Sequence, residues 1–241
     1  MKRLHTHSQH FLRNPQYVKE LIGHTTIKRT DIVYDIGAGT GIISSVLASR
    51  CKEVIAMEID PRTAATLRQN TASYQNITVM EGDFLAMDLP ATPYKIFANI
   101  PFHLSSAILR KITEDFNSPL ASYLIVQKQF ANKLLPDHGG FSSQLGMLLG
   151  IRFSIRIRKR LKRTDFWPFP NVDTVLIEIT LRDQPLISRE LQPAYCKFIE
   201  THFTVPELFA KLPLSQIGKT RVVKPSSLTL SEWLTLFHLT H

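Results

Sequence analysis

The sequence predicts an α/β fold: a parallel sheet with helices on both faces, plus a small C-terminal all-helical domain. Between residues 32 and 135, short apolar runs alternate with segments whose apolar residues recur at helical spacing. Parallel strands joined by helices produce this alternation. Beyond residue 182 the strand signals stop, and apolar residues such as Tyr195, Phe198 and Ile199 recur at helical spacing.

The first elements follow from local signals. Asn14 and Pro15 predict the start of a helix, because Asn is a favoured N-cap and Pro fits the first helical position. Pro61 marks another helix start in the same way. The predicted strands cover residues 32–36, 53–58, 77–80, 94–98 and 120–126, and the predicted helices cover residues 42–50, 61–71, 105–113 and 128–135.

The pattern changes after the Gly139-Gly140 turn. Residues 151–158 and 175–181 are predicted to form an antiparallel pair of strands at the edge of the sheet. The stretch Asp183-Gln184-Pro185 is interpreted as a linker, and Ser231-Glu232 as the cap of a last helix. We therefore expect a first domain over residues 1–182 and a small helical domain over residues 183–241.

Composition favours a polyanionic partner. The net charge is +9, while 44% hydrophobic and 20% charged residues are ordinary for a globular protein. Neutralising phosphates releases condensed counterions, which favours binding of a basic protein to nucleic acid. No run approaches the ~18 apolar residues of a membrane span, and the N-terminus lacks the apolar core of a signal peptide. The only cysteines are Cys51 and Cys196, so a reducing cytoplasm is the simplest location. We also expect a monomer.

The positive charge is concentrated in two segments. A charge run of this kind can be a solvated surface or a nucleic-acid contact, and two of them favour RNA or DNA. One segment holds Arg152, Arg156, Arg158, Lys159, Arg160, Lys162 and Arg163, and the other holds Lys2, Arg3, Arg13, Lys19, Lys28 and Arg29 against the single acid Glu20.

Three motifs follow successive predicted strands. Asp35 to Gly41 is a glycine-rich turn between a strand and a helix, where the backbone can approach a ligand; dinucleotide enzymes also have such a turn. Glu58 ends the next strand, where its two carboxylate oxygens are placed to accept hydrogen bonds from both ribose hydroxyls. Asp83 follows the third strand, where it can accept a hydrogen bond from an adenine amino group or simply form a turn. Open α/β sheets bind ligands at this edge.

The tetrapeptide Asn99-Ile100-Pro101-Phe102 follows the fourth strand. An exocyclic base amine is a poor nucleophile, because its lone pair is delocalised into the ring. A methylating site must therefore supply acceptors for its N–H groups and a flat surface for the base. An Asn side-chain oxygen, a carbonyl before a proline and an aromatic ring are such groups, so the motif indicates methylation of an exocyclic amine.

The motifs and their order resemble those of S-adenosylmethionine-dependent rRNA adenine-N6 methyltransferases. More narrowly they resemble the Erm family, which methylates an adenine of large-subunit (23S) rRNA and confers macrolide-lincosamide-streptogramin B resistance. The resemblance covers nearly the whole chain. It rests on Ser8-Gln9-His10-Phe11-Leu12, Asp35 to Gly41, Glu58-Ile59-Asp60, Gly82-Asp83, Phe97 to Phe102, and Phe166-Trp167-Pro168-Phe169-Pro170-Asn171-Val172-Asp173.

The resemblance implies a Rossmann-like class I methyltransferase sheet, with residues 1–182 as the catalytic domain and residues 183–241 assisting RNA binding. A flipped-out adenine would stack between Phe102 and Phe166, and Asn99 Oδ1 and the Ile100 carbonyl, before Pro101, would accept from N6. No metal is required. The implied cofactor contacts are Gln9, His10, Leu12, Gly37, Ala38, Gly39, Glu58, Ile59, Asp83, Phe84 and Asn99, and the candidate RNA contacts are Arg13, Arg110, Lys111, Lys128, Lys133, Arg156, Arg158, Lys159, Arg160, Lys162 and Arg163.

Some residues depart from the family pattern. His10 replaces the usual Asn, and Phe102 replaces the commoner Tyr; His103 is interpreted as a local hydrogen-bonding residue rather than a general base. The nearest alternative is the small-subunit (16S) rRNA dimethyladenosine transferase, which commonly has Leu where this chain has Ile100. DNA adenine methyltransferases fit less well, because their motif usually carries two prolines. A non-catalytic RNA-binding assembly factor would not need Glu58, Asp83 and Asn99.

Overall fold

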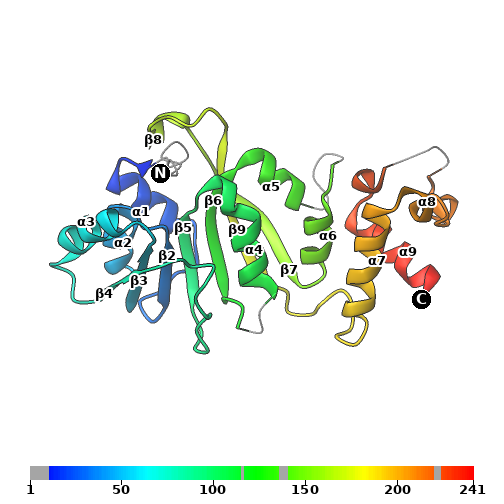
Figure 1. The fold of residues 1–241 in the computed structure, drawn as a ribbon, viewed down its shortest axis with the longest axis horizontal. Helices are drawn as coiled ribbons and strands as arrows, with labels where there is room; N and C mark the ends of the chain where they lie inside the picture. Colours follow the sequence, from blue (N-terminus) through cyan, green and yellow to red (C-terminus); the bar gives the residue numbers. More distant parts are fainter. Residues whose placement is uncertain (1–10, 115–116, 136–140, 220–223) are drawn as a thin grey trace, which may run out of the picture. The chain divides into compact units, whose positions relative to one another are not determined.

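The computed structural model describes residues 11–114, 117–135, 141–219 and 224–241. Within these residues the predicted fold class is confirmed, because a seven-stranded sheet is combined with helices and followed by further helices (Figure 1). The strand order across the sheet is β4-β3-β2-β5-β6-β9-β7. The strands are β2 (Ile32–Ile36), β3 (Glu53–Glu58), β4 (Ile77–Glu81), β5 (Lys95–Asn99), β6 (Ala121–Gln127), β7 (Phe153–Leu161) and β9 (Thr174–Leu181).

The order of the strands creates a switch point between β2 and β5. The chain passes from β2 to β3 and β4 towards one edge, and from β5 to β6 towards the other, and all these pairs are parallel. Because crossovers between parallel strands are right-handed, α2 (Ile42–Ala48) and α3 (Pro61–Thr71) lie on one face of the sheet and α4 (Ser105–Glu114) on the other. Ligands of open α/β sheets bind beside such a switch point, at the carboxyl ends of the strands.

Most element boundaries agree with the sequence predictions. The helix α1 (Pro15–Gly23) begins after Asn14, whose side chain accepts a hydrogen bond from the Gln16 N–H at 2.8 Å. Asp60 caps α3 in the same way, accepting from the Thr63 N–H at 2.8 Å. The predicted pair of edge strands corresponds to β9 and β7, which are neighbours, and β9 pairs antiparallel with β6.

Three local features differ from the predictions. A two-stranded sheet joins β1 (Phe11–Leu12) to β8 (Phe166–Trp167), and neither strand is predicted because two residues give no periodicity. The helix α6 (Gln144–Gly150) is also not predicted, because its seven residues make only two turns, too few to establish a helical period. Helix α9 (Leu230–Thr240) is capped by Thr229 rather than Ser231, since the Glu232 N–H donates to Thr229 Oγ1 at 3.3 Å and the Thr229 N–H donates to Glu232 Oε2 at 2.8 Å.

The chain divides into two compact units, Met1–Lys128 with Arg156–Thr180, and Gln129–Ile155 with Leu181–His241. Of the three places where the chain passes from one unit to the other, the last, between Thr180 and Leu181, lies beside residue 182, the domain boundary predicted from the sequence. Residues 129–155, however, group with the C-terminal helices. The second unit therefore contains α6, α7 (Gln192–Thr204), α8 (Pro206–Phe209), α9 and most of α5 (Lys128–Leu134). It also contains the short 3-10 helices η3 (Leu214–Ile217) and η4 (Pro225–Ser227).

Each unit has its own hydrophobic core. The first buries apolar residues of α1, β2, β5 and β6 together. The second surrounds Trp233, whose ring contacts Phe198 and Phe209. A Cβ at Gly150 would lie 2.8 Å from Leu230 Cδ2, so α6 and α9 approach closely there. Among the described residues, no helix is long and apolar enough to cross a membrane.

Candidate active site

The glycine-rich turn lies at the carboxyl end of β2. Gly37, Gly39 and Gly41 have φ angles of 69°, 58° and 94°, which residues with a side chain rarely adopt. The Ala38 N–H donates to the Met57 carbonyl at 2.8 Å, so the turn folds across the end of β3. The backbone at these positions is therefore fixed in a shape that depends on glycine.

Glu58 ends β3 and is buried beside this turn. Its Oε2 accepts from the Gly39 N–H at 2.9 Å, and its Oε1 accepts from the Asp60 N–H at 3.0 Å. Each carboxylate oxygen can accept a further hydrogen bond, so the side chain is held ready for a pair of adjacent hydroxyls. The following residue, Ile59, exposes its apolar side chain and can cover a planar ring.

The segment after β4 provides a second acid. Asp83 is exposed, and its Oδ1 accepts from the Leu85 N–H at 2.8 Å, which forms the local turn that the sequence left open as an alternative. The ring of Phe84 is buried, and the Lys111 ammonium lies 5.8 Å from its centroid. Phe84 therefore supports this loop from inside, and Ile59 rather than the Phe84 ring offers apolar surface at this edge.

Asn99 ends β5, and the three residues after it form the loop beside the glycine turn. Asn99 and Phe102 are half-buried, and Ile100 is buried. A Cβ added at Gly37 would lie 3.7 Å from Pro101 Cδ, which is van der Waals contact. Phe102 begins the short 3-10 helix η1 (Phe102–Leu104). The two motifs, which are far apart in the sequence, thus meet at the switch point of the sheet.

Asp35 lies under the glycine turn and is completely buried. Its Oδ2 accepts from the Ser44 hydroxyl at 2.6 Å, whereas Oδ1 has no hydrogen-bond partner among the described residues. Burial raises the pKa of the Asp35 carboxyl to about 7, and the negative charge of Glu58 adds to this effect, against the hydrogen bonds from Ser44.

Phe166 is not at the surface of the site. Its side chain is fully buried in the core, where it packs with residues such as Leu12 and Phe97. The prediction that Phe166 stacks on the target base therefore disagrees with this structure, because no face of the ring is exposed. The neighbouring side chains of Trp167 and Phe169 are exposed instead.

The predicted N-terminal cofactor segment is only partly described. Gln9 and His10 lie outside the described residues. Leu12 is buried and is paired with Phe166 between β1 and β8. Any contact of Leu12 with a cofactor would therefore involve its backbone rather than its side chain.

Part of the basic cluster neutralises a buried acid. Glu178 on β9 is buried, and a guanidinium nitrogen of Arg156 lies 2.9 Å from its Oε2 in an ion pair without hydrogen-bond geometry. Arg158 lies 3.8 Å from the same oxygen, and its Nε donates to the His24 carbonyl at 3.0 Å. The Tyr123 hydroxyl donates to Glu178 Oε1 at 3.0 Å. Two of the predicted RNA contacts therefore have a structural task.

Other predicted RNA contacts are spread over the surface. Lys159 pairs with Glu20 at 2.7 Å, and Asp173 pairs with both Arg163 at 3.3 Å and Lys128 at 3.9 Å. Arg160 and Lys162 are exposed, and no side-chain ion pair is found for either within the described part of the chain. Of the remainder, Arg13 and Arg110 are exposed and Lys111 is half-buried in the first unit, and Lys133 is exposed in the second unit.

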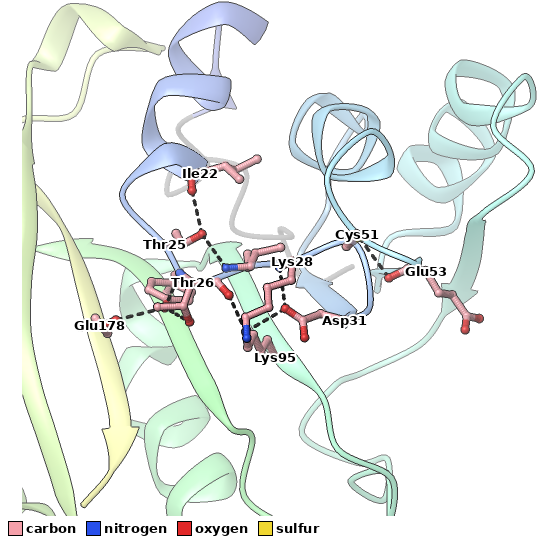
Figure 2. Close-up of polar contacts among 11 residues, drawn as sticks. Ile22, Thr25, Thr26, Lys28, Asp31, Cys51, Glu53, Lys95 and Glu178 are labelled. Atoms are coloured by element: carbon pink, nitrogen blue, oxygen red, sulfur yellow. Dashed lines mark hydrogen bonds and ion pairs between the residues drawn. The ribbon is translucent and has the colours of Figure 1, made fainter.

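A polar network fixes the opposite, amino-terminal edge of the sheet (Figure 2). The buried Lys95 ammonium donates to the Thr26 carbonyl at 2.6 Å and to Asp31 Oδ2 at 2.7 Å. The Thr26 N–H donates to the Tyr123 hydroxyl at 2.9 Å, which links this network to Glu178. These charged groups are paired with one another and hold β2, β5, β6 and β9 in register.

No group of three metal-ligating side chains occurs among the residues that the structure describes. A surface hollow of about 300 Å³ borders Thr40 and Gly41, but it contains none of the predicted cofactor contacts; Pro15, Ile42, Ser45, Val46, Asn70 and Tyr74 complete its wall. The candidate site is therefore defined by the strand ends and not by this hollow.

The sheet, the glycine turn, and the acids after β3 and β4 define a class I S-adenosylmethionine-dependent methyltransferase. The chain matches the ribosomal RNA adenine dimethylase family over residues 2–214, and it belongs to that family. The Erm-type resemblance and the predicted enzyme class and cofactor are thereby confirmed: the protein is an rRNA adenine-N6 methyltransferase that uses S-adenosylmethionine.

Individual relatives agree with this family. The chain is 32% identical over 237 residues to an rRNA adenine N-6-methyltransferase of Staphylococcus aureus, which covers 96% of this chain and 94% of the relative. It is 25% identical over 261 residues to ribosomal RNA small subunit methyltransferase A of Levilactobacillus brevis, covering 97% and 88%. Among solved structures, the 23S rRNA methyltransferase ErmE matches with a TM-score of 0.83 and 27% identity, over 95% of this chain and 98% of ErmE.

Proposed function

We propose that this enzyme methylates N6 of a specific adenine in 23S rRNA, once or twice, and so confers macrolide-lincosamide-streptogramin B resistance. The observation that carries the proposal is the close approach of the glycine turn to the Asn99–Phe102 loop, where a Cβ added at Gly37 would lie 3.7 Å from Pro101 Cδ. A group held by the turn and a base held by the loop would lie next to each other, as transfer between them requires.

The side chains present fit S-adenosylmethionine. Glu58 would accept from the two ribose hydroxyls, because each of its oxygens has only one backbone donor in the structure. Asp83 would accept from the adenine amino group, and Ile59 would cover the adenine ring. When bound, the cofactor supplies an electrophilic methyl group.

The Asn99–Phe102 loop would prepare the nucleophile. Asn99 Oδ1 and the Ile100 carbonyl would accept hydrogen bonds from the target amine, which localises its lone pair on nitrogen. Phe102 would stack on the base and hold it in line with the methyl group. These groups act through position and electrostatics, and their interactions strengthen as the nitrogen becomes tetrahedral.

The choice of 23S rRNA is supported by the relatives. ErmE is named a 23S rRNA methyltransferase and matches nearly the whole chain, at 27% identity. The small-subunit enzyme of Levilactobacillus brevis, at 25% identity, is the basis of the alternative, methylation of 16S rRNA in ribosome biogenesis. We further propose that the enzyme acts as a cytoplasmic monomer, with residues 1–182 as its catalytic domain and the C-terminal helices assisting RNA binding.

Methylation of the two rRNAs decides between these substrates. The purified enzyme is given labelled S-adenosylmethionine with unmodified 23S or 16S rRNA in single-turnover reactions, and modified adenines are mapped by reverse transcription. We expect label at one 23S adenine, and raised macrolide resistance when the gene is expressed in a sensitive bacterium. Label only in 16S rRNA, at a pair of neighbouring adenines, would refute the 23S assignment.

A further inference from the structure

Two large aromatic side chains are exposed together on the first compact unit. Trp167 is 60% exposed and Phe169 is 49% exposed. Their rings contact edge to face, with centroids 5.5 Å apart, and the Arg13 guanidinium lies 5.5 Å from the centre of a Trp167 ring. We call these three residues the aromatic platform. Single exposed apolar residues are common, but paired exposed aromatics beside a cation are typical of binding surfaces.

The backbone fixes how the platform faces. Side chains alternate along a strand, so the burial of Phe166 in the core turns Trp167 outward. Phe11 of β1 pairs with Trp167, and the Arg13 N–H donates to the Asp165 carbonyl at 3.2 Å. The backbone of Trp167 and Arg13 is therefore held by pairing with neighbouring segments, which lowers the entropy lost when a ligand binds.

The platform lies on the same edge of the sheet as the methyl-transfer site. The loop that carries it ends at Asp173, whose carbonyl accepts from the Lys128 N–H at 2.8 Å, directly after the carboxyl end of β6. The neighbouring strand β5 ends at Asn99, which is paired with Ile125 of β6. The segment that carries Trp167 and Phe169 thus enters β9 at the carboxyl edge of the sheet, and only β6 separates β9 from the strand that ends at Asn99.

We propose that the aromatic platform stacks on an unpaired base of the RNA substrate other than the adenine that is methylated. This inference rests on the proposed RNA substrate. Base stacking on aromatic rings tolerates any base, because every base has a flat face, and the Arg13 guanidinium can also contact a phosphate. The exposed cations Arg160, Lys162 and Arg163 belong to the same unit, which suits a phosphate backbone.

Tryptophan fluorescence can report this contact directly. The chain contains two tryptophans, and Trp233 is fully buried in the other unit, whereas Trp167 is exposed. Acrylamide should therefore quench Trp167 selectively. We expect a 23S rRNA hairpin with an unpaired loop to protect Trp167 from acrylamide, and a fully paired duplex of equal length to protect it less. Equal protection by the duplex would overturn base stacking.

Variants then test whether the contact contributes to affinity. Trp167→Ala and Phe169→Ala should each raise the Kd for the hairpin about 5- to 150-fold, with an unchanged salt slope because no phosphate contact is lost. Trp167→Phe should keep most of the affinity and lose the fluorescence signal. The control is Tyr74→Ala, since Tyr74 is also an exposed aromatic, at 38%, but precedes the amino end of β4; its Kd should stay unchanged.

Methylation of the same RNA by the wild type separates the two proposals. If the wild type methylates 23S rRNA while both alanine variants bind the hairpin as tightly as it does, the aromatic platform has no RNA role. If the wild type methylates neither rRNA, the proposed function itself is wrong, whatever the fluorescence shows.

Discussion

Arg156 approaches Glu178 to 2.9 Å, so a residue of the basic cluster neutralises a carboxylate that is buried in the sheet. Arg158 lies 3.8 Å from the same carboxylate. The charges of β7 and the residues after it therefore divide into two groups with different tasks. Arg156 and Arg158 stabilise the fold, whereas Arg160 and Lys162 are exposed and are the better candidates for RNA contacts.

Charge reversal should separate these groups in folding experiments. Arg156→Glu places a second acid beside a buried carboxylate, and we expect it to lower the free energy of unfolding by about 1–3 kcal/mol. Arg160→Glu on the same strand should leave it unchanged to within about 0.5 kcal/mol. Thermal and urea unfolding of both variants gives the comparison, and equal destabilisation would show that the pair with Glu178 is not the cause.

RNA binding should depend on the two exposed cations, Arg160 and Lys162. Arg160→Glu and Lys162→Glu should weaken binding of an rRNA fragment and reduce the salt slope by about 1 for each phosphate contact that is lost. Binding of S-adenosylmethionine should be unaffected. Filter binding at several salt concentrations tests this, and slopes equal to that of the wild type would mean that the two residues form a solvated surface.

Glu58 should be the main side-chain contact for the cofactor. Glu58→Ala removes an acceptor of charge-assisted hydrogen bonds, and we expect it to weaken S-adenosylmethionine binding by about 1.5–3 kcal/mol. The matched control is Glu53→Ala, because Glu53 begins the same strand at its other end. Calorimetric titration of both variants and the wild type with S-adenosylmethionine measures the difference in binding free energy. A wild type that does not bind the cofactor would contradict the assignment of the whole site.

Asn99 and Phe102 should carry the methyl-transfer step. Asn99→Ala should fold and bind RNA but transfer methyl groups far more slowly, since the lost acceptor acts in the transition state. Phe102→Ala should also lose activity, while Phe102→Tyr keeps the ring face and should retain most of it. Single-turnover rates measure these effects, and an Asn99→Ala rate equal to that of the wild type would remove Asn99 from the mechanism.

Asp35 should make the stability depend on pH. Burial raises its pKa to about 7 in the folded protein, against about 4 when unfolded. The folded state therefore binds the proton more tightly, and this stabilisation is complete below about pH 4 and is lost as the pH rises through about 7. Asp35→Asn keeps an acceptor for Ser44 but cannot ionise, so its free energy of unfolding should fall less steeply as the pH rises. Urea unfolding of both proteins between these pH values tests this prediction. The same dependence of the free energy of unfolding on pH in the variant and the wild type would contradict it.

The sequence by itself determined the order of the elements and the motifs at their ends. The glycines of the first turn, the caps at Asn14 and Asp60, and the strand that ends at Glu58 are local features, and local chemistry decides them. The sequence also located Asn99–Phe102 after a strand, and hence at the carboxyl edge of a parallel sheet.

Only the tertiary structure decided which residues of these motifs are buried, exposed or paired. Phe166, Trp167 and Phe169 belong to one motif, yet the first is in the core and the other two are exposed. A strand pair two residues long turns Phe166 inward and Trp167 outward. The same is true of the basic cluster, where Arg156 forms an ion pair with Glu178 and Arg160 does not. Such choices depend on contacts between distant segments, and no local pattern in the sequence records them.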